Sequence, residues 1–98
     1  MTINTTKDGS VLTVALEGRL DTMTAPELEA VLGKEMPAAE KLILDFDKLE
    51  YISSAGLRVL LAAHKTMVSK GGMKVTNTNE IVKEVFDVTG FSDILTIE

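Results

Sequence analysis

Residues 2–18 alternate, in their second half, between apolar positions and polar or small ones. Val11, Val14 and Leu16 hold the apolar places, and this period is typical of a strand with one buried face. Asp8-Gly9 supplies residue types that tolerate a tight reversal of the chain. The pattern predicts two strands joined as a hairpin.

The next segment changes to apolar spacings of three and four, the period of a helix with one face against a core. Thr24 can accept the amide proton of Glu27 while Glu27 reaches back, so a capping box marks the start, and Pro37 marks the end. The apolar positions are Leu28, Val31, Leu32 and Met36. We predict a first helix here.

Two further segments repeat the helical spacing. One runs from about Ser54 to Lys70 and stops at Gly71-Gly72, and the other covers 79–90. The apolar positions are Leu57, Leu60, Leu61, His64 and Val68 in the first and Ile81, Val82, Val85 and Phe86 in the second. Because His64 lies within an apolar stripe, we expect it to be a partly buried packing residue rather than a catalytic base.

Short apolar runs lie between these helices. Residues 41–46 are bounded by charges, as expected of a strand covered on both faces, and a short loop at 47–51 follows them. Residues 73–77 and 94–98 are interpreted as two more strands. The order strand-strand-helix-strand-helix-strand-helix-strand predicts an α/β fold with a mixed, mostly parallel sheet and helices packed on it.

Composition limits the domain count and the functions. A chain of 98 residues with 45% hydrophobic residues can fill one core but not two, so 1–98 is expected to be a single domain. The net charge of −5 disfavours nucleic acid as a partner. With no cysteine and one histidine, we expect no disulfide, no metal site and no cofactor. Because no membrane span or secretory signal is evident, we expect a cytosolic protein that does not insert into a membrane.

Two adjacent serines, Ser53 and Ser54, stand where a strand passes into the second helix. The first amide groups of a helix lack intrahelical acceptors and carry partial positive charge. One interpretation is that either serine simply caps the helix. The other is that a hydroxyl here carries a phosphate, whose charge the backbone amides receive. The position alone leaves both interpretations open.

Four stretches of the sequence resemble the bacterial anti-sigma-factor antagonists, which are single STAS domains. They are GRLDTMTAPEL, LILDFDKLEYISSAGLRVLL, GGMKVTN and VFDVTGFSDIL, in the family's order and spacing. The resemblance implies a STAS fold and a regulatory protein rather than an enzyme. Its unphosphorylated form would bind an anti-sigma factor that is itself a serine kinase and so free the sigma factor. Phosphorylation by that kinase would end binding, and a metal-dependent serine phosphatase would restore it.

The family's common run Asp-Ser-(Ser or Thr)-Gly-Leu falls on residues 53–57. Ser54 is therefore the phosphate acceptor that the resemblance implies, and Ser53 is the less favoured candidate. Ser53 stands where the family has an acid, and Ala55 stands where it has a second hydroxyl. Asp21 matches the family's acid before the first helix, which in relatives lies near the acceptor. Its other interpretation is an aspartate that forms a turn.

The expected partner-binding surface surrounds the acceptor. Arg58 lies one helical turn after Ser54, so it either reaches a phosphate there or is a solvated surface residue. Met23 is either an exposed contact for a partner or a staple onto the first helix. A glycine inside a helix is costly, and Gly56 is explained by close approach of a partner, a phosphate or the first helix. The whole set is Asp21, Thr22, Met23, Ser53, Ser54, Gly56, Leu57 and Arg58.

Other functions fit the residues less well. The run ISSAG lacks the glycine of a hydrolase nucleophile elbow, and His64 stands roughly 15 Å along the helix from Ser54. No phosphate-binding loop of the GxxxxGK[ST] kind is present. The main alternative is a STAS subunit of a membrane lipid transporter, or a scaffold module in a stress-signalling assembly, without a phosphoswitch. The sequence leaves the oligomeric state open, and we expect a monomer.

Overall fold

The strands form one mixed sheet in the order of the sequence. The computed structural model describes residues 1–98, with strands β1 (Thr2–Asp8), β2 (Val11–Leu20), β3 (Lys41–Ile52), β4 (Met73–Thr76) and β5 (Thr96–Ile97). β1 pairs antiparallel with β2, and β2 to β5 pair parallel to one another. The predicted hairpin and the α/β fold class are therefore confirmed.

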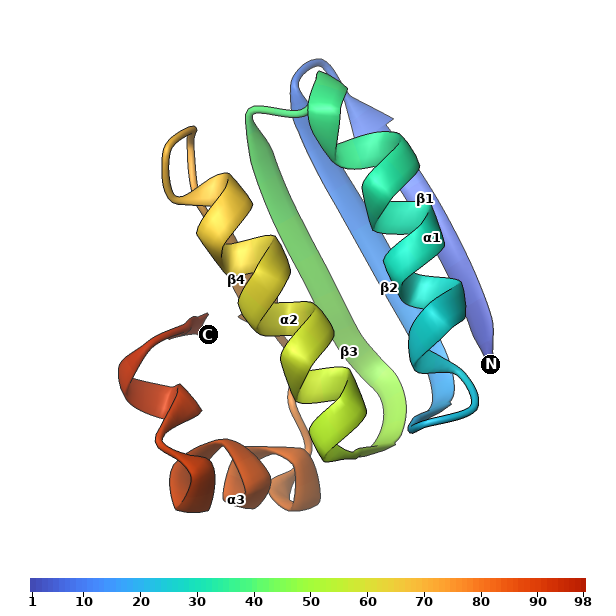
Figure 1. Ribbon diagram of the computed structural model, residues 1–98, viewed down its shortest axis with the longest axis vertical. Coiled ribbons are helices and arrows are strands. Elements are labelled where there is room, and N and C mark those ends of the chain that lie inside the picture. The colour runs from blue at the N-terminus through green and yellow to red at the C-terminus, as the bar shows by residue number, and fades with distance from the viewer.

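Three helices connect the parallel strands: α1 (Ala25–Glu35), α2 (Ser54–Met67) and α3 (Glu80–Thr89). Short 3-10 helices follow α1 (Met36–Ala38) and α3 (Phe91–Asp93). In Figure 1, α1 and α2 lie side by side over one face of the sheet, while α3 runs across near the N-terminal end of α2. The core therefore lies between the sheet and these helices.

The helices cover one face of the sheet and leave the other open. Leu12, Val14 and Leu16 of β2 are fully buried, whereas the residues between them are half-exposed. Ile43 and Asp45 of β3 are half-exposed as well, so the expectation of a strand covered on both faces is wrong. The alternation places every second side chain in a core that holds no polar or charged residue.

β3 is longer than predicted, because it continues through 47–51, which the sequence indicated as a loop. Its pairing with β2 shifts register twice in this stretch, and at each shift β3 carries one extra residue, as in a β-bulge. The buried positions Phe46, Leu49 and Ile52 are therefore three residues apart. A search for a period of two misses such a strand.

α2 ends at Met67, earlier than the predicted Lys70. Met67 is fully buried, whereas Val68, which the spacing placed in the apolar stripe, is exposed. Leu61 and His64 lie at the edge of the stripe and are half-buried. The buried stripe of α2 therefore includes Met67 and not Val68, because only Met67 faces the sheet.

Details of α1, of the last strand and of α3 were also predicted, and not all of them agree with the structure. Thr24 does not form a capping box with Glu27, because its backbone is already helical and its hydroxyl bonds elsewhere. α1 ends at Glu35 with Met36 as its C-cap, directly before Pro37, so the predicted end is confirmed; Pro37 itself lies in the short 3-10 helix that follows. The last strand is only two residues long instead of 94–98, since a 3-10 helix leads into it. In α3, Ile81 is exposed rather than part of the core.

Candidate functional site

The C-terminal ends of β2 and β3 lie side by side and lead into α1 and α2. The amide of Ser53 donates a hydrogen bond to the carbonyl of Leu20 at 2.8 Å. The chain continues from these two residues into Ser54 on one side and Asp21 on the other. The structure therefore brings together the two segments that the sequence singled out.

The two serines differ in exposure. Ser53 occupies the N-cap position of α2, and its carbonyl accepts the amide of Leu57 at 2.9 Å. Its Oγ, however, is buried and makes no hydrogen bond. Ser54 is the first residue of the helix and is exposed. No serine hydroxyl caps α2, and the first amides of this helix keep no side-chain acceptor.

Asp21 holds the turn between β2 and α1. Its Oδ1 accepts the amides of Met23 at 3.0 Å and Thr24 at 3.1 Å, and the Thr24 hydroxyl lies 3.2 Å away. Partial desolvation raises the pKa of Asp21, but these hydrogen bonds and the charge of Arg19 outweigh it and lower the pKa below its ordinary value. The geometry fits the interpretation of Asp21 as a turn aspartate, placed beside the start of α2.

Met23 lies at the tip of this turn, where its side chain is 83% exposed. The staple onto the first helix is therefore not formed. Thr22, beside it, is exposed too. A flexible, unpacked methionine of this kind is suited to contact with an irregular partner surface.

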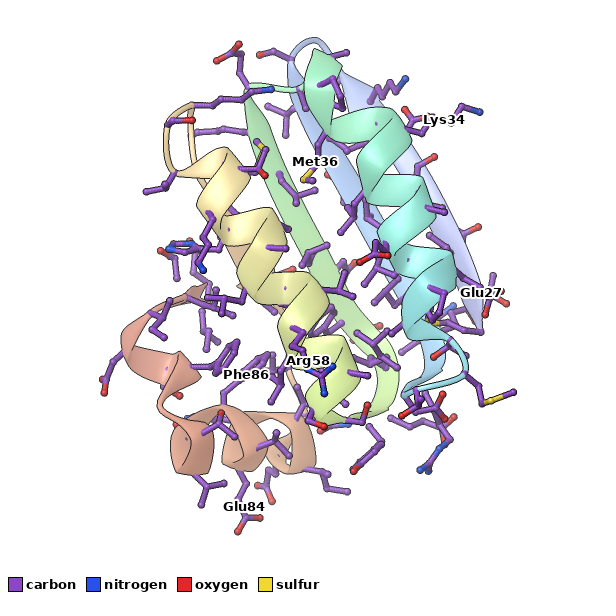
Figure 2. The ribbon with its side chains drawn as sticks, viewed as in Figure 1. Glu27, Lys34, Met36, Arg58, Glu84 and Phe86 are labelled. Atoms are coloured by element: carbon purple, nitrogen blue, oxygen red, sulfur yellow. The ribbon has the colours of Figure 1, made fainter.

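A shallow groove of about 220 Å³ separates the first turns of α1 and α2. Arg58 lines it, together with Thr22, Pro26 and Ala55. Figure 2 shows Arg58 at the N-terminal end of α2, where it is exposed and forms no ion pair. Pro26 and Ala55 were not singled out from the sequence. Their positions in the first turns of two adjacent helices are the signal that could have found them.

Gly56 and Leu57 lie in the interior, so they are not part of an accessible surface. A Cβ at position 56 would lie 2.7 Å from Leu20 Cγ and 2.9 Å from Ile52 Cγ1. Glycine is needed here because α2 packs closely on the ends of β2 and β3. This corrects the alternatives of a partner, a phosphate or the first helix as the cause. Leu57 is 6% exposed and belongs to the core.

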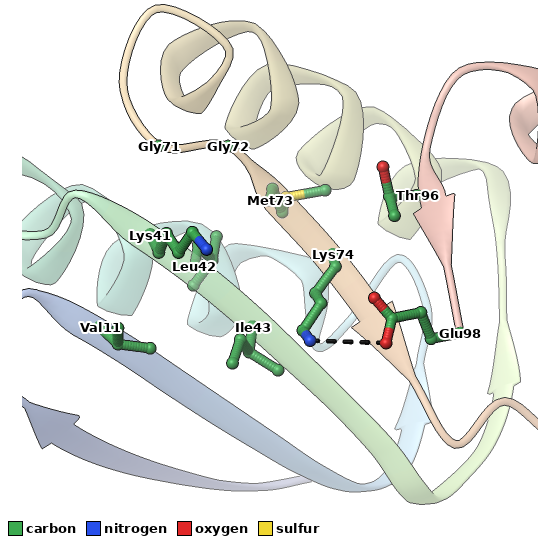
Figure 3. Close-up of a pocket in the computed structure, with 10 residues that line it drawn as sticks. All are labelled: Val11, Lys41, Leu42, Ile43, Gly71, Gly72, Met73, Lys74, Thr96 and Glu98. Atoms are coloured by element: carbon green, nitrogen blue, oxygen red, sulfur yellow. Dashed lines mark hydrogen bonds and ion pairs between the residues drawn. The ribbon is translucent and has the colours of Figure 1, made fainter.

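A larger hollow of about 390 Å³ lies on the open face of the sheet (Figure 3). Its Lys74 is paired with Glu98 at 3.5 Å, and Val11 and Ile43 contribute apolar walls. Lys41 and Thr96 also line it. The structure holds no group of three side chains suited to a metal ion, and none of its helices is long and apolar enough to cross a membrane.

The sequence is similar to proteins of one regulatory class. A family model described as STAS domain matches residues 2–98. BtrV of Bordetella bronchiseptica, described as a candidate anti-sigma factor antagonist, is 34% identical over 99% of this chain and 85% of its own. The anti-sigma-B factor antagonist of Bacillus subtilis is 33% identical over 86% of this chain and 78% of its own.

Solved structures share the fold at lower identity. An anti-sigma factor antagonist from Mycobacterium paratuberculosis has a TM-score of 0.90 at 24% identity, over 98% of this chain and 83% of its own. The antagonist SpoIIAA in its unphosphorylated form has a TM-score of 0.85 at 18% identity, over 99% and 88%. SpoIIAA of Bacillus in its phosphorylated form has a TM-score of 0.76 at 17% identity, over 99% and 91%. With the fold shown by these structures and the family by the model match and the identity to BtrV, the chain belongs to the STAS domain family, and its curated relatives are anti-sigma factor antagonists.

Proposed function

We propose that the chain is an anti-sigma-factor antagonist whose binding is switched by phosphorylation of Ser54. Unphosphorylated, it binds an anti-sigma factor that is also a serine kinase, and the sigma factor is released. The kinase transfers the γ-phosphoryl group of ATP to the Ser54 hydroxyl, ADP and the hydroxyl proton are released, and the modified protein leaves the complex. A serine phosphatase hydrolyses the phosphoester and restores binding.

The observation that carries this proposal is the exposed hydroxyl of Ser54 on the first residue of α2, whose N-terminal amides have no side-chain acceptor. A kinase must bring the acceptor oxygen into line with a phosphate, so the acceptor has to be reachable. The Oγ of Ser53 is buried. Exposure therefore favours Ser54 over Ser53.

A phosphate on Ser54 is compatible with the fold. It adds about −1.5 to −2 charge, and the free amides and dipole at the start of α2 stabilise negative charge. Arg58, one turn along the same helix, is exposed and free of other ion pairs, so its guanidinium is available to the phosphate. We expect the fold to be kept and the surface charge to change.

The residues that can touch the partner are the exposed ones, Thr22, Met23, Ser54 and Arg58. Asp21 shapes the turn that presents Met23. Gly56 and Leu57 act from the interior by holding the first turn of α2 on the sheet. A partner packed against this surface meets a neutral hydroxyl before phosphorylation and a dianion after it. The added charge and its hydration oppose close packing.

The test is intact-mass and fragment spectrometry after incubation with ATP and the anti-sigma kinase encoded nearest to this protein. We expect one phosphate on Ser54 in the wild type, none in Ser54→Ala, and one on Ser54 in Ser53→Ala. No phosphate on either serine despite an active kinase contradicts the switch. That result favours the transporter or scaffold role instead.

Binding to the same kinase tests the consequence of the phosphate. Ser54→Asp should bind more weakly than the wild type, because it places a carboxylate on the contact surface. Ser54→Ala should bind and should resist release by ATP. Equal affinities of Ser54→Asp and the wild type, measured by titration calorimetry, would sink the proposal that charge at this position controls docking.

A further inference from the structure

α3 carries a wider apolar face than the sheet covers. Val82 and Phe86 are fully buried, and they fasten the helix to the core. Ile81, Val85 and Val88 recur at spacings of four and three, so they form a second row beside the buried one. Ile81 is 57% and Val88 is 79% exposed, while Val85 is half-buried. We call Ile81, Val85 and Val88 the outer stripe of α3.

The outer stripe has an acidic border. Glu84 lies three residues after Ile81 and four before Val88, so it neighbours both on the helix surface. Glu80 precedes Glu84 by four residues and continues the same row. Figure 2 shows Glu84 pointing away from the body of the molecule. A fitting partner surface is therefore apolar opposite the stripe and basic at its edge.

A second copy of the chain does not meet this requirement. Two stripes packed antiparallel about a twofold axis near Val85 would bring Glu84 of one copy close to Glu84 of the other. Like charges at such a distance disfavour association, and each copy also carries a net charge of −5. The charge pattern thus favours a different protein with basic residues beside an apolar groove.

The outer stripe lies at the same end of the molecule as Ser54. Asn79, which precedes α3, donates from Nδ2 to the carbonyls of Leu49 at 2.9 Å and Glu50 at 3.5 Å. Glu50 is three residues before Ser53, or roughly 10 Å along an extended strand. In Figure 1, α3 runs past the N-terminal end of α2. The stripe and the phosphorylation site can therefore face one partner.

We infer that the outer stripe of α3 is a second contact for the anti-sigma partner, which offers it an apolar groove edged by lysine or arginine. The inference rests on the proposed function. The stripe supplies apolar affinity that the Ser54 phosphate does not alter, while the phosphate supplies the switch. Loss of the stripe and negative charge at Ser54 should therefore weaken binding by independent factors.

The experiment measures the affinity of the full chain for the anti-sigma kinase by titration calorimetry. Ile81→Ser and Val88→Ser each remove an exposed apolar contact and should weaken binding about five- to tenfold. Val68→Ser is the matched control, because Val68 is 64% exposed at the opposite end of α2. It should change the affinity less than about twofold. Circular dichroism confirms that the three variants stay folded.

Two more variants test the role of the acidic border and whether the outer stripe and Ser54 contribute independently to binding. Glu84→Lys should weaken binding and flatten its dependence on salt, because it reverses the charge that faces the partner's basic edge. Val88→Ser combined with Ser54→Asp should lose affinity by the product of the two separate factors. A measured factor well below that product would contradict two independent contacts.

The outcomes separate this inference from the proposed function. Failure of the wild type to bind the kinase overturns both. Binding that Ser54→Asp weakens but Ile81→Ser and Val88→Ser leave unchanged overturns the stripe alone and keeps the switch. Sedimentation that shows a dimer of the wild type and a monomer of Val88→Ser would assign the stripe to self-association and also overturn the inference.

Discussion

The N-terminal ends of α2 and α3 have different hydrogen bonds, although each helix follows the C-terminal end of a parallel strand, β3 or β4. At α3, Asn79 Oδ1 accepts the amide of Val82 at 2.8 Å, and its Nδ2 bonds to the carbonyl of Leu49 on β3. At α2, the Oγ of Ser53 bonds to nothing. One helix start is closed by its cap, and the other leaves its amides available.

The difference bears on the proposed phosphate at Ser54, because it separates a helix start that is capped from one that is not. A side-chain cap and a phosphate need the same amide groups, so a capped start would have to give up its cap to receive a phosphate. A missing cap costs about 0.5–2 kcal/mol. α2 is held instead by interior packing, through Gly56 against the strand ends and through the buried Leu57. Gly56 and Leu57 thus attach the start of α2 to the core, and its uncapped backbone amides remain for the phosphate that we propose on Ser54.

The largest expected effect comes from disturbing that packing. In Gly56→Ala the new methyl group would meet Leu20 and Ile52 at under 3 Å, so the free energy of unfolding should fall by about 1–3 kcal/mol. Gly33→Ala is the control, since a Cβ there meets nothing within 4 Å. Removing that exposed helical glycine should raise the free energy of unfolding by about 0.5–1 kcal/mol. Urea denaturation measures both, and the same sign for the two variants would contradict close packing at the start of α2.

The second effect compares the two caps directly. Asn79→Ala removes the bond to the Val82 amide and the bond to β3, so the free energy of unfolding should fall by about 1–2 kcal/mol. Ser53→Ala removes a hydroxyl that has no partner, so stability should change by less than about 0.5 kcal/mol. Equal losses in denaturation curves would show that Ser53 caps α2 after all.

A smaller effect tests whether the amides of α2 receive an anion. Ser54→Asp should raise the free energy of unfolding by about 0.3–1 kcal/mol at low salt, and the gain should shrink as salt is added. Ser69→Asp, just beyond the C-terminal end of α2, should lower it, because the helix dipole has the opposite sign there. Thermal unfolding at two salt concentrations measures both. Destabilisation by Ser54→Asp would contradict an anion-ready helix start.

The sequence predicted the fold well where one period governed a whole element. The alternation before Leu16 and the helical spacing of α1 each reflect burial against one layer, so local pattern and tertiary packing agree. In α3 the spacing predicts the helix, but Ile81 of its predicted stripe is exposed. The predicted third strand was too short, because two bulges change the spacing of its buried residues at Phe46 and Leu49. The bulges arise from the pairing of β3 with β2. Such a property belongs to two strands and cannot be read from one.

The candidate site was predicted in part. The start of a helix pointed to Ser53 and Ser54 together, and only the family resemblance preferred Ser54, which is exposed. Met23 was left between a partner contact and a staple, and its exposure excludes the staple. The glycine at 56 was noticed, but its cause required knowing that Leu20 and Ile52 lie beneath it. The exposure of Ile81 and Val88 was not predicted, because a helical stripe shows which residues are apolar and not how much of that stripe a neighbour covers.

The start of α1 differs from those of α2 and α3, because the carboxylate of Asp21 in the preceding turn accepts the amides of Met23 and Thr24. We expect the smallest effect on stability here, since it depends on the ionisation of this one carboxyl group. Folding lowers the pKa of Asp21 from its ordinary value of 3.8, so the folded state favours the carboxylate. Its contribution to stability is therefore complete above that value and is lost as the pH falls through the lower, folded pKa. Asp21→Asn removes this titration, so the wild type should lose more stability than the variant when the pH falls from about 5 to about 2. The pKa of Glu35, lowered by its hydrogen bond to Lys7, adds the same slope to both proteins and cancels in the comparison. Parallel curves of unfolding free energy against pH would mean that the charge of Asp21 does not hold this turn.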